Sequence, residues 1–148
     1  MISFEKIMTQ EHKELLLKYL CAGLPYKVKC QVYDDPVSYT LSGIIPSRIY
    51  QELYFEEMDY KECDGFIDIK YSKPYLFPLS SMTEEQKREY NNLKHDVLVC
   101  HYEYGDVVEE IELYDSPDSF EYLIENHFDV YDLIPLGLAI DATGLNIY

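Results

Sequence analysis

The chain has 148 residues and a mass of 17.5 kDa, which is the size of one ordinary domain. Apolar residues make up 47% and charged residues 27%, a balance that excludes a disordered chain. Twelve Lys and Arg against 28 Asp and Glu give a formal net charge of −16, which disfavours direct binding to nucleic acid and to anionic membranes. We therefore expect a single acidic domain over residues 1–148, with no membrane partner.

The negative charge is concentrated in the last third of the chain. Residues 1–31 carry +2 and residues 32–94 carry −5, whereas residues 95–148 contain thirteen acidic side chains and no Lys or Arg. One interpretation is an acidic exterior that keeps a small protein soluble. The sharper interpretation is a contact surface for a basic protein, such as a groove that otherwise holds nucleic acid.

The first predicted element is an N-terminal helix of about a dozen residues. Thr9 can cap its first turn, and Gly23 followed by Pro25 can end it. Alternating apolar and polar residues then predict a β-hairpin at about 26–42. A second hairpin is expected at about 52–72, with Asp64-Gly65 as its turn.

Residues 73–78 contain two prolines, each of which removes a backbone donor, so we expect an extended surface segment or an edge strand there. Thr83 and Gln86 form the pattern of a capping box at the start of a middle helix. This helix, at about 84–94, is polar nearly all round and should be largely exposed.

A third hairpin is predicted at about 97–114, with Gly105-Asp106 as a type II′ turn. Ser116 and Pro117 then predict a C-terminal helix with a buried stripe ending at His127, and a short further helical segment follows at 129–136. The predicted fold class is therefore α+β. An antiparallel sheet is built from the three hairpins, with the N-terminal helix, the polar middle helix and the C-terminal helices packed on it.

The motifs of catalysis, metal binding and cofactor binding are absent from the sequence, so we expect no enzyme, no metal and no cofactor. Asp68 and Lys70 need separate consideration, because an acid and a lysine two apart on a strand share a face. With Glu57 or Asp59 they match the arrangement of metal-dependent nucleases. The alternative is a solvent-facing charge pair, which is favoured because the acidic field opposes a nucleic-acid substrate.

Two blocks of the sequence carry a resemblance. Lys73 to Gln86 (KPYLFPLSSMTEEQ) and residues 119–139 (SFEYLIENHFDVYDLIPLGLA) resemble a family of small proteins of phages and prophages that infect gut Bacteroidetes. The segments 24–33 and 41–43 resemble the same group less specifically. The resemblance implies a phage-type origin and a bacterial cytoplasm as the location, and it supplies no catalytic residues.

A phage origin favours a non-enzymatic binding protein that sequesters or blocks a host component, such as one of antiviral defence. The expected partner is then a host protein with a basic surface. A second hypothesis is a sponge for a nucleotide immune signal, in which tyrosines stack on the base and lysines contact the phosphate. The lysines available for this are Lys27, Lys29, Lys70 and Lys73. A third is a structural or accessory protein of the phage, and the sequence leaves a homo-oligomer open.

The candidate binding surface lies around the proline-containing segment. Its residues are Lys73, Tyr75, Phe77, Ser80 and Ser81. The prolines reduce the entropy lost on binding and can hold the two aromatic rings in an extended presentation. The alternative is that both rings pack over the sheet edge and the serines serve the start of the helix.

Overall fold

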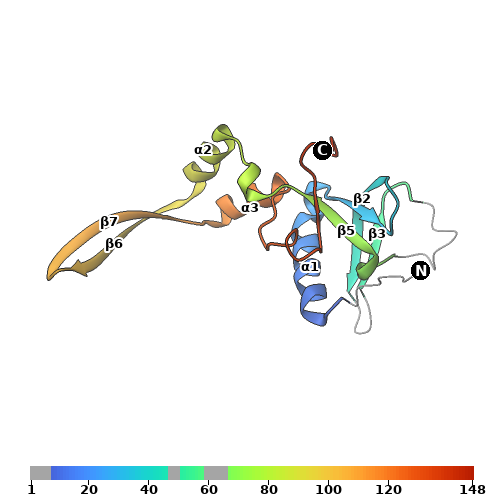
Figure 1. Cartoon of the computed structure of the whole chain (residues 1–148), viewed down its shortest axis with the longest axis horizontal. Helices are drawn as coiled ribbons and strands as arrows, with labels where there is room; N and C mark the ends of the chain where they lie inside the picture. Colours follow the sequence, from blue (N-terminus) through green and yellow to red (C-terminus); the bar gives the residue numbers. More distant parts are fainter. Residues whose placement is uncertain (1–7, 47–50, 59–66) are drawn as a thin grey trace.

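The computed structural model describes residues 8–46, 51–58 and 67–148. Its body is built on a six-stranded sheet in the order β4-β3-β2-β1-β5-β8 (Figure 1). Neighbouring strands are antiparallel except β5 and β8, which are parallel. The strands are β1 (Lys29–Val32), β2 (Ser38–Pro46), β3 (Gln51–Phe55), β4 (Ile67–Asp68), β5 (Ser72–Leu76) and β8 (Ile140–Asp141). The predicted α+β class is confirmed.

The helices begin where the sequence predicts. In α1 (Gln10–Gly23), the Thr9 hydroxyl accepts from the His12 backbone N–H. The capping box of Thr83 and Gln86 starts α2 (Glu84–Leu93), and this helix buries none of its residues, as expected. Ser116 caps α3 (Pro117–Glu125). Each of these signals is local, which explains why the sequence predicts them.

The core lies between the sheet and α1. Leu16, Tyr19 and Leu20 of the helix are fully buried and belong to one apolar cluster with strand residues such as Cys30 and Leu53. α1 ends at Gly23, and the chain continues directly into a 3₁₀ turn, η1 (Leu24–Tyr26). Within the described residues, no helix is long and apolar enough to cross a membrane.

Strand β5 corrects the prediction of an edge or surface segment, because it lies inside the sheet between β1 and β8. Pro74 faces Cys30, and the Tyr33 N–H donates to Tyr71 O at 2.8 Å. Since hydrogen-bonded pairs alternate along an antiparallel ladder, Pro74 falls on a pair that exchanges no hydrogen bonds with β1. On the other side of β5, strand β8 pairs only with Tyr75 and Leu76, so the missing N–H of Pro74 costs no hydrogen bond there.

The hairpins are formed, but they do not all join one sheet. β1 and β2 pair as predicted, and β3 pairs with β4, while the predicted Asp64-Gly65 turn lies outside the described residues. The third hairpin, β6 (His95–Glu103) and β7 (Asp106–Tyr114), forms a separate two-stranded sheet. This corrects the expectation of a single sheet. The hairpin is separate because its two ends are held by α2 and α3 rather than by a sheet strand.

The segment 129–136 is a series of turns instead of the expected short helix. The Asp129 carboxylate does accept from the backbone N–H groups of Leu133 and Ile134, at 2.8 Å each. These contacts resemble a helix cap, but Asp132 has a φ of 56°, which a continuing right-handed helix cannot contain. The cap is therefore present without the helix.

Tyr148 completes the ladder between β1 and β5. Its hydroxyl accepts from the Lys29 backbone N–H at 2.8 Å and donates to Tyr75 O at 2.9 Å. Lys29 and Tyr75 would form the next hydrogen-bonded pair of the register, so the hydroxyl stands in for that rung. The Tyr148 ring stacks on His127, with 3.7 Å between ring centroids and 10° between planes.

Candidate protein-binding surface

The arm, residues 95–114, is the part of the described chain that extends away from the body. Figure 1 shows it projecting beyond α2 and α3, far from the six-stranded sheet. Nearly every arm residue is exposed, and only Val99 and Val108 are half-buried. Both faces of the arm are therefore available to a partner.

The tip of the arm is a tight turn at Tyr104-Gly105. Their φ values of 51° and 85° are both positive, which defines a type I′ turn. The expected turn at Gly105-Asp106 is therefore shifted by one residue, and Asp106 instead pairs with Glu103 as the first residue of β7. The type I′ geometry is favoured because its twist matches that of the flanking strands.

The base of the arm is fixed by hydrogen bonds between α2 and α3. The Ser116 hydroxyl donates to Leu93 O, and the Tyr90 hydroxyl donates to the Asp115 carboxylate. Ser119 Oγ donates to the same carboxylate at 3.1 Å. Burial and the Asp115 hydrogen bond raise the pKa of Tyr90 above its usual range, because both favour the protonated hydroxyl. These contacts hold the two ends of the arm together.

The chemistry of the arm is unusual for an exposed surface. It contains six acidic residues and no Lys or Arg. Its large apolar side chains are nevertheless open to solvent, with Tyr102 82% exposed, Ile111 72% and Leu98 61%. A large exposed apolar patch on a protein surface is typical of an interaction site. An isolated two-stranded hairpin is only marginally stable, so these side chains do not serve to stabilise the arm by itself.

The predicted surface around the proline segment is not a single exposed patch. Lys73, Ser80 and Ser81 are exposed, but Tyr75 is only 5% exposed and sits in the sheet. Phe77 packs against Phe128 and Tyr148. Ser81 Oγ donates to Pro78 O at 2.6 Å, within the 3₁₀ turn η3 (Leu79–Ser81) that precedes α2. A role of these five residues in binding stays a prediction.

The Asp68 and Lys70 pair does not lie on one strand. Asp68 ends β4, and its carboxylate accepts from the Lys70 backbone N–H at 3.1 Å, which caps the 3₁₀ turn η2 (Ile69–Tyr71). The Lys70 ammonium lies over the Tyr71 ring at 4.9 Å. Asp59 is outside the described residues. Among the residues that are described, no cluster of His, Cys, Asp and Glu could hold a metal ion.

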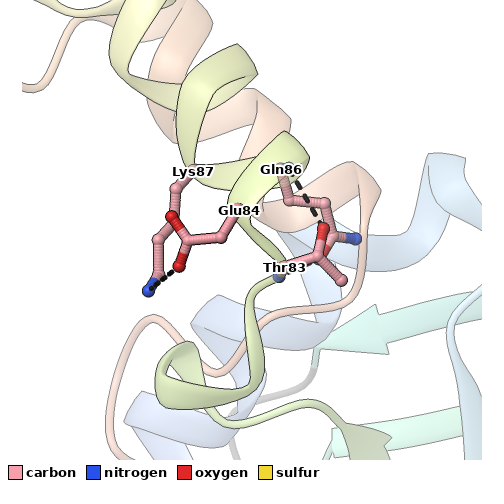
Figure 2. A network of polar contacts seen from close by, with 4 residues as sticks. All are labelled: Thr83, Glu84, Gln86 and Lys87. Atoms are coloured by element: carbon pink, nitrogen blue, oxygen red, sulfur yellow. Dashed lines mark hydrogen bonds and ion pairs between the residues drawn. The ribbon is translucent and has the colours of Figure 1, made fainter.

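The lysines considered for a nucleotide are partly engaged already. Lys29 Nζ donates to Ile147 O at 3.0 Å, and Lys70 lies over a tyrosine ring. A hollow of about 420 Å³ lies along α2, lined by Glu84, Lys87, Arg88, Asn91 and Asn92. Figure 2 shows that Lys87 is paired there with Glu84, at 3.1 Å, beside the Thr83–Gln86 capping box. No aromatic ring lines this hollow, so it lacks the stacking surface that a base needs.

His127 and the cysteines are the remaining groups that could carry chemistry. His127 lies beyond the end of α3 with a φ of 62°, and burial together with the Lys29 charge lowers its pKa to about 4, so its ring is uncharged at neutral pH. Of the described cysteines, Cys30 is buried, whereas Cys21 and Cys100 are exposed.

Searches against family models, curated proteins and solved structures found no match to this chain. The sequence indicates the acidic last third of the chain, which contains the arm, as a possible contact surface, but it does not single out the exposed apolar residues of the arm. A signal was present, because apolar residues alternate on both strands of a predicted hairpin that contains six acidic residues and no Lys or Arg.

Proposed function

We propose that the chain is a non-enzymatic binding protein that blocks a partner protein, and that the arm contacts a basic surface of that partner. The observation that carries the proposal is the combination of exposed Leu98, Tyr102 and Ile111 with six acidic residues and no basic ones on one projecting hairpin. The apolar side chains supply area to bury, and the charge steers a basic partner toward the arm.

The resemblance to phage and prophage proteins points to a host component as the target, such as a protein of antiviral defence in the bacterial cytoplasm. Blocking requires only occupancy of a surface, so no catalytic group is needed on either side. An acidic protein of net charge −16 also suits a target whose basic groove normally holds a nucleic acid.

A photo-crosslinking experiment tests this function. A benzoylphenylalanine replaces Tyr104, which is 99% exposed at the tip of the arm, and in a control it replaces Glu11, which is exposed on α1. Both full-length proteins are expressed in a gut Bacteroidetes host and irradiated. We expect one basic host protein to be crosslinked in stoichiometric amounts from position 104 and not from position 11. No crosslinked protein from the arm, or the same products from both positions, would refute the proposal.

A further inference from the structure

The register of the arm divides its side chains between two chemically different faces. Residues directly opposite in an antiparallel ladder point to the same side, and Leu98 pairs with Ile111 while Tyr102 pairs with Val107. Leu113 and Cys100 lie on this side too, which we call the apolar face. Only two charged residues share it, and both are acids: Asp96 opposite Leu113, and Glu109 opposite Cys100.

The other face of the arm is mixed. It carries most of the acids, two histidines and smaller apolar residues. These are His95, Val97, Val99, His101, Glu103, Asp106, Val108, Glu110, Glu112 and Tyr114. Polar side chains on this face already interact with each other, since the Tyr114 hydroxyl donates to Glu112 at 2.5 Å and His101 lies 3.9 Å from the Glu103 carboxylate. This face therefore has less unpartnered apolar surface.

The dimensions of the apolar face suit a single helix. From Leu113 to Val107 the strand covers six residue steps, about 20 Å at ~3.4 Å per residue. A ribbon of two strands about 5 Å apart, with its side chains, is roughly as wide as an α-helix of about 10 Å diameter. A helix of about four turns would cover the face from end to end.

The charges of the arm determine which kind of helix fits. Asp96 lies at the base of this face and Glu109 lies between its two apolar pairs, and the remaining acids of the arm add to the same negative field. Lys or Arg beside the apolar stripe of the partner helix would meet these carboxylates. A second copy of the arm would instead bring six acids against six acids with no Lys or Arg on either side. The charge therefore selects a basic partner over self-association.

We propose that the apolar face of the arm docks a basic amphipathic helix of about four turns that belongs to the partner protein. This inference deepens the proposed function and rests on it, because it names the part of the partner that the arm contacts. Leu98 and Ile111 lie at the centre of the contact and provide its affinity. The acids provide the rate of association and its dependence on salt.

The test uses the full-length protein and three synthetic peptides of equal length, labelled for fluorescence anisotropy. The first is an amphipathic helix of Leu and Lys, the second is oligolysine, and the third is an amphipathic helix of Leu and Glu. We expect the Leu/Lys helix to bind at least about tenfold more tightly than oligolysine, since oligolysine lacks the apolar stripe. The Leu/Glu helix should not bind. Equal binding of the Leu/Lys helix and oligolysine would overturn the inference.

Two neighbouring residues give a matched pair of variants. Leu98→Thr changes the apolar face, whereas Val97→Thr changes the opposite face one residue away, and threonine keeps strand propensity in both. We expect Leu98→Thr to lower the affinity for the Leu/Lys helix about tenfold, and Val97→Thr to change this affinity by less than about twofold. Equal amide exchange rates along the arm in both variants confirm that the hairpin is intact. Equal losses of affinity in the two variants would contradict the inference.

The same variants separate this inference from the function on which it rests. If the crosslinking experiment captures a basic protein through position 104 but Leu98→Thr binds it as well as Val97→Thr does, the function stands and the docking face is wrong. If position 104 captures no protein, the function itself fails. Sedimentation of the wild-type chain should show a monomer, and a dimer that Leu98→Thr dissociates would mean that a second copy covers the apolar face.

Discussion

The Tyr148 hydroxyl gives a prediction that the structure allows to be worked through in free energy. Tyr148→Phe keeps the ring that stacks on His127 and removes only the oxygen atom. The Lys29 N–H then loses its acceptor, and the Tyr75 carbonyl loses its donor, at a position where Tyr75 is 5% exposed. Each lost hydrogen bond costs about 1–1.5 kcal/mol, so we expect unfolding to require about 2–3 kcal/mol less.

The assay is urea unfolding at neutral pH, followed by the change in ellipticity. For a chain of this length the same loss corresponds to a melting temperature lower by roughly 5–10 °C. Tyr104→Phe is the matched control, because the hydroxyl at the exposed tip of the arm should contribute less than about 0.5 kcal/mol. A Tyr148→Phe protein as stable as the control would show that the hydroxyl does not complete the β1–β5 ladder, and the reasoning would be wrong.

Three further perturbations follow from single sites. The pKa of His127 is lowered to about 4 by burial and by the Lys29 charge, so its contribution to stability is complete above about pH 6.5 and is lost as the pH falls toward 4. When the pH is lowered from about 7.5 to about 4.5, the free energy of unfolding measured in urea should therefore fall by roughly 1–2 kcal/mol more for the wild type than for His127→Phe. An equal decrease in the two proteins would contradict this. Tyr104→Asn places the preferred residue beside Gly105 in the type I′ turn, so amide exchange in the arm should slow several-fold; unchanged exchange would argue against that turn. Asp129→Ala removes the acceptor of two backbone N–H groups at 2.8 Å and should cost about 2–3 kcal/mol, whereas a cost below about 0.5 kcal/mol would show that the turns do not depend on it.

The features that could be predicted from the sequence are those decided by a few neighbouring residues. Thr9, Ser116 and the Thr83–Gln86 box mark helix starts because a cap is formed within one turn of chain. The prediction of an edge or surface segment failed at Pro74, because the effect of a proline on a strand depends on whether its nitrogen lies at a hydrogen-bonded position of the ladder. That depends on the register with β1, which the sequence does not encode locally.

The candidate site was harder to predict for the same reason. The alternation in residues 97–114 correctly predicts a hairpin, but whether its apolar face meets a core or solvent depends on where α2 and α3 hold its ends. Tyr75 is the reverse case, because an aromatic residue between prolines is typical of an exposed recognition segment, whereas Tyr75 is 5% exposed within the sheet. Contacts such as Tyr148 with Lys29 join residues 119 positions apart, beyond the reach of any local pattern.

The hydrogen bonds at the base of the arm also have a consequence for how such a protein can diversify. Because Ser116 contacts Leu93, the chain enters and leaves the arm at adjacent points, and the body needs nothing from the hairpin except that its ends meet. Residues 95–114 could be exchanged for a different hairpin, or closed by a short loop, without moving α2, α3 or the six-stranded sheet. Under the proposed function, target choice and folding would therefore depend on separate stretches of one chain, and the arm could change without a change in the body.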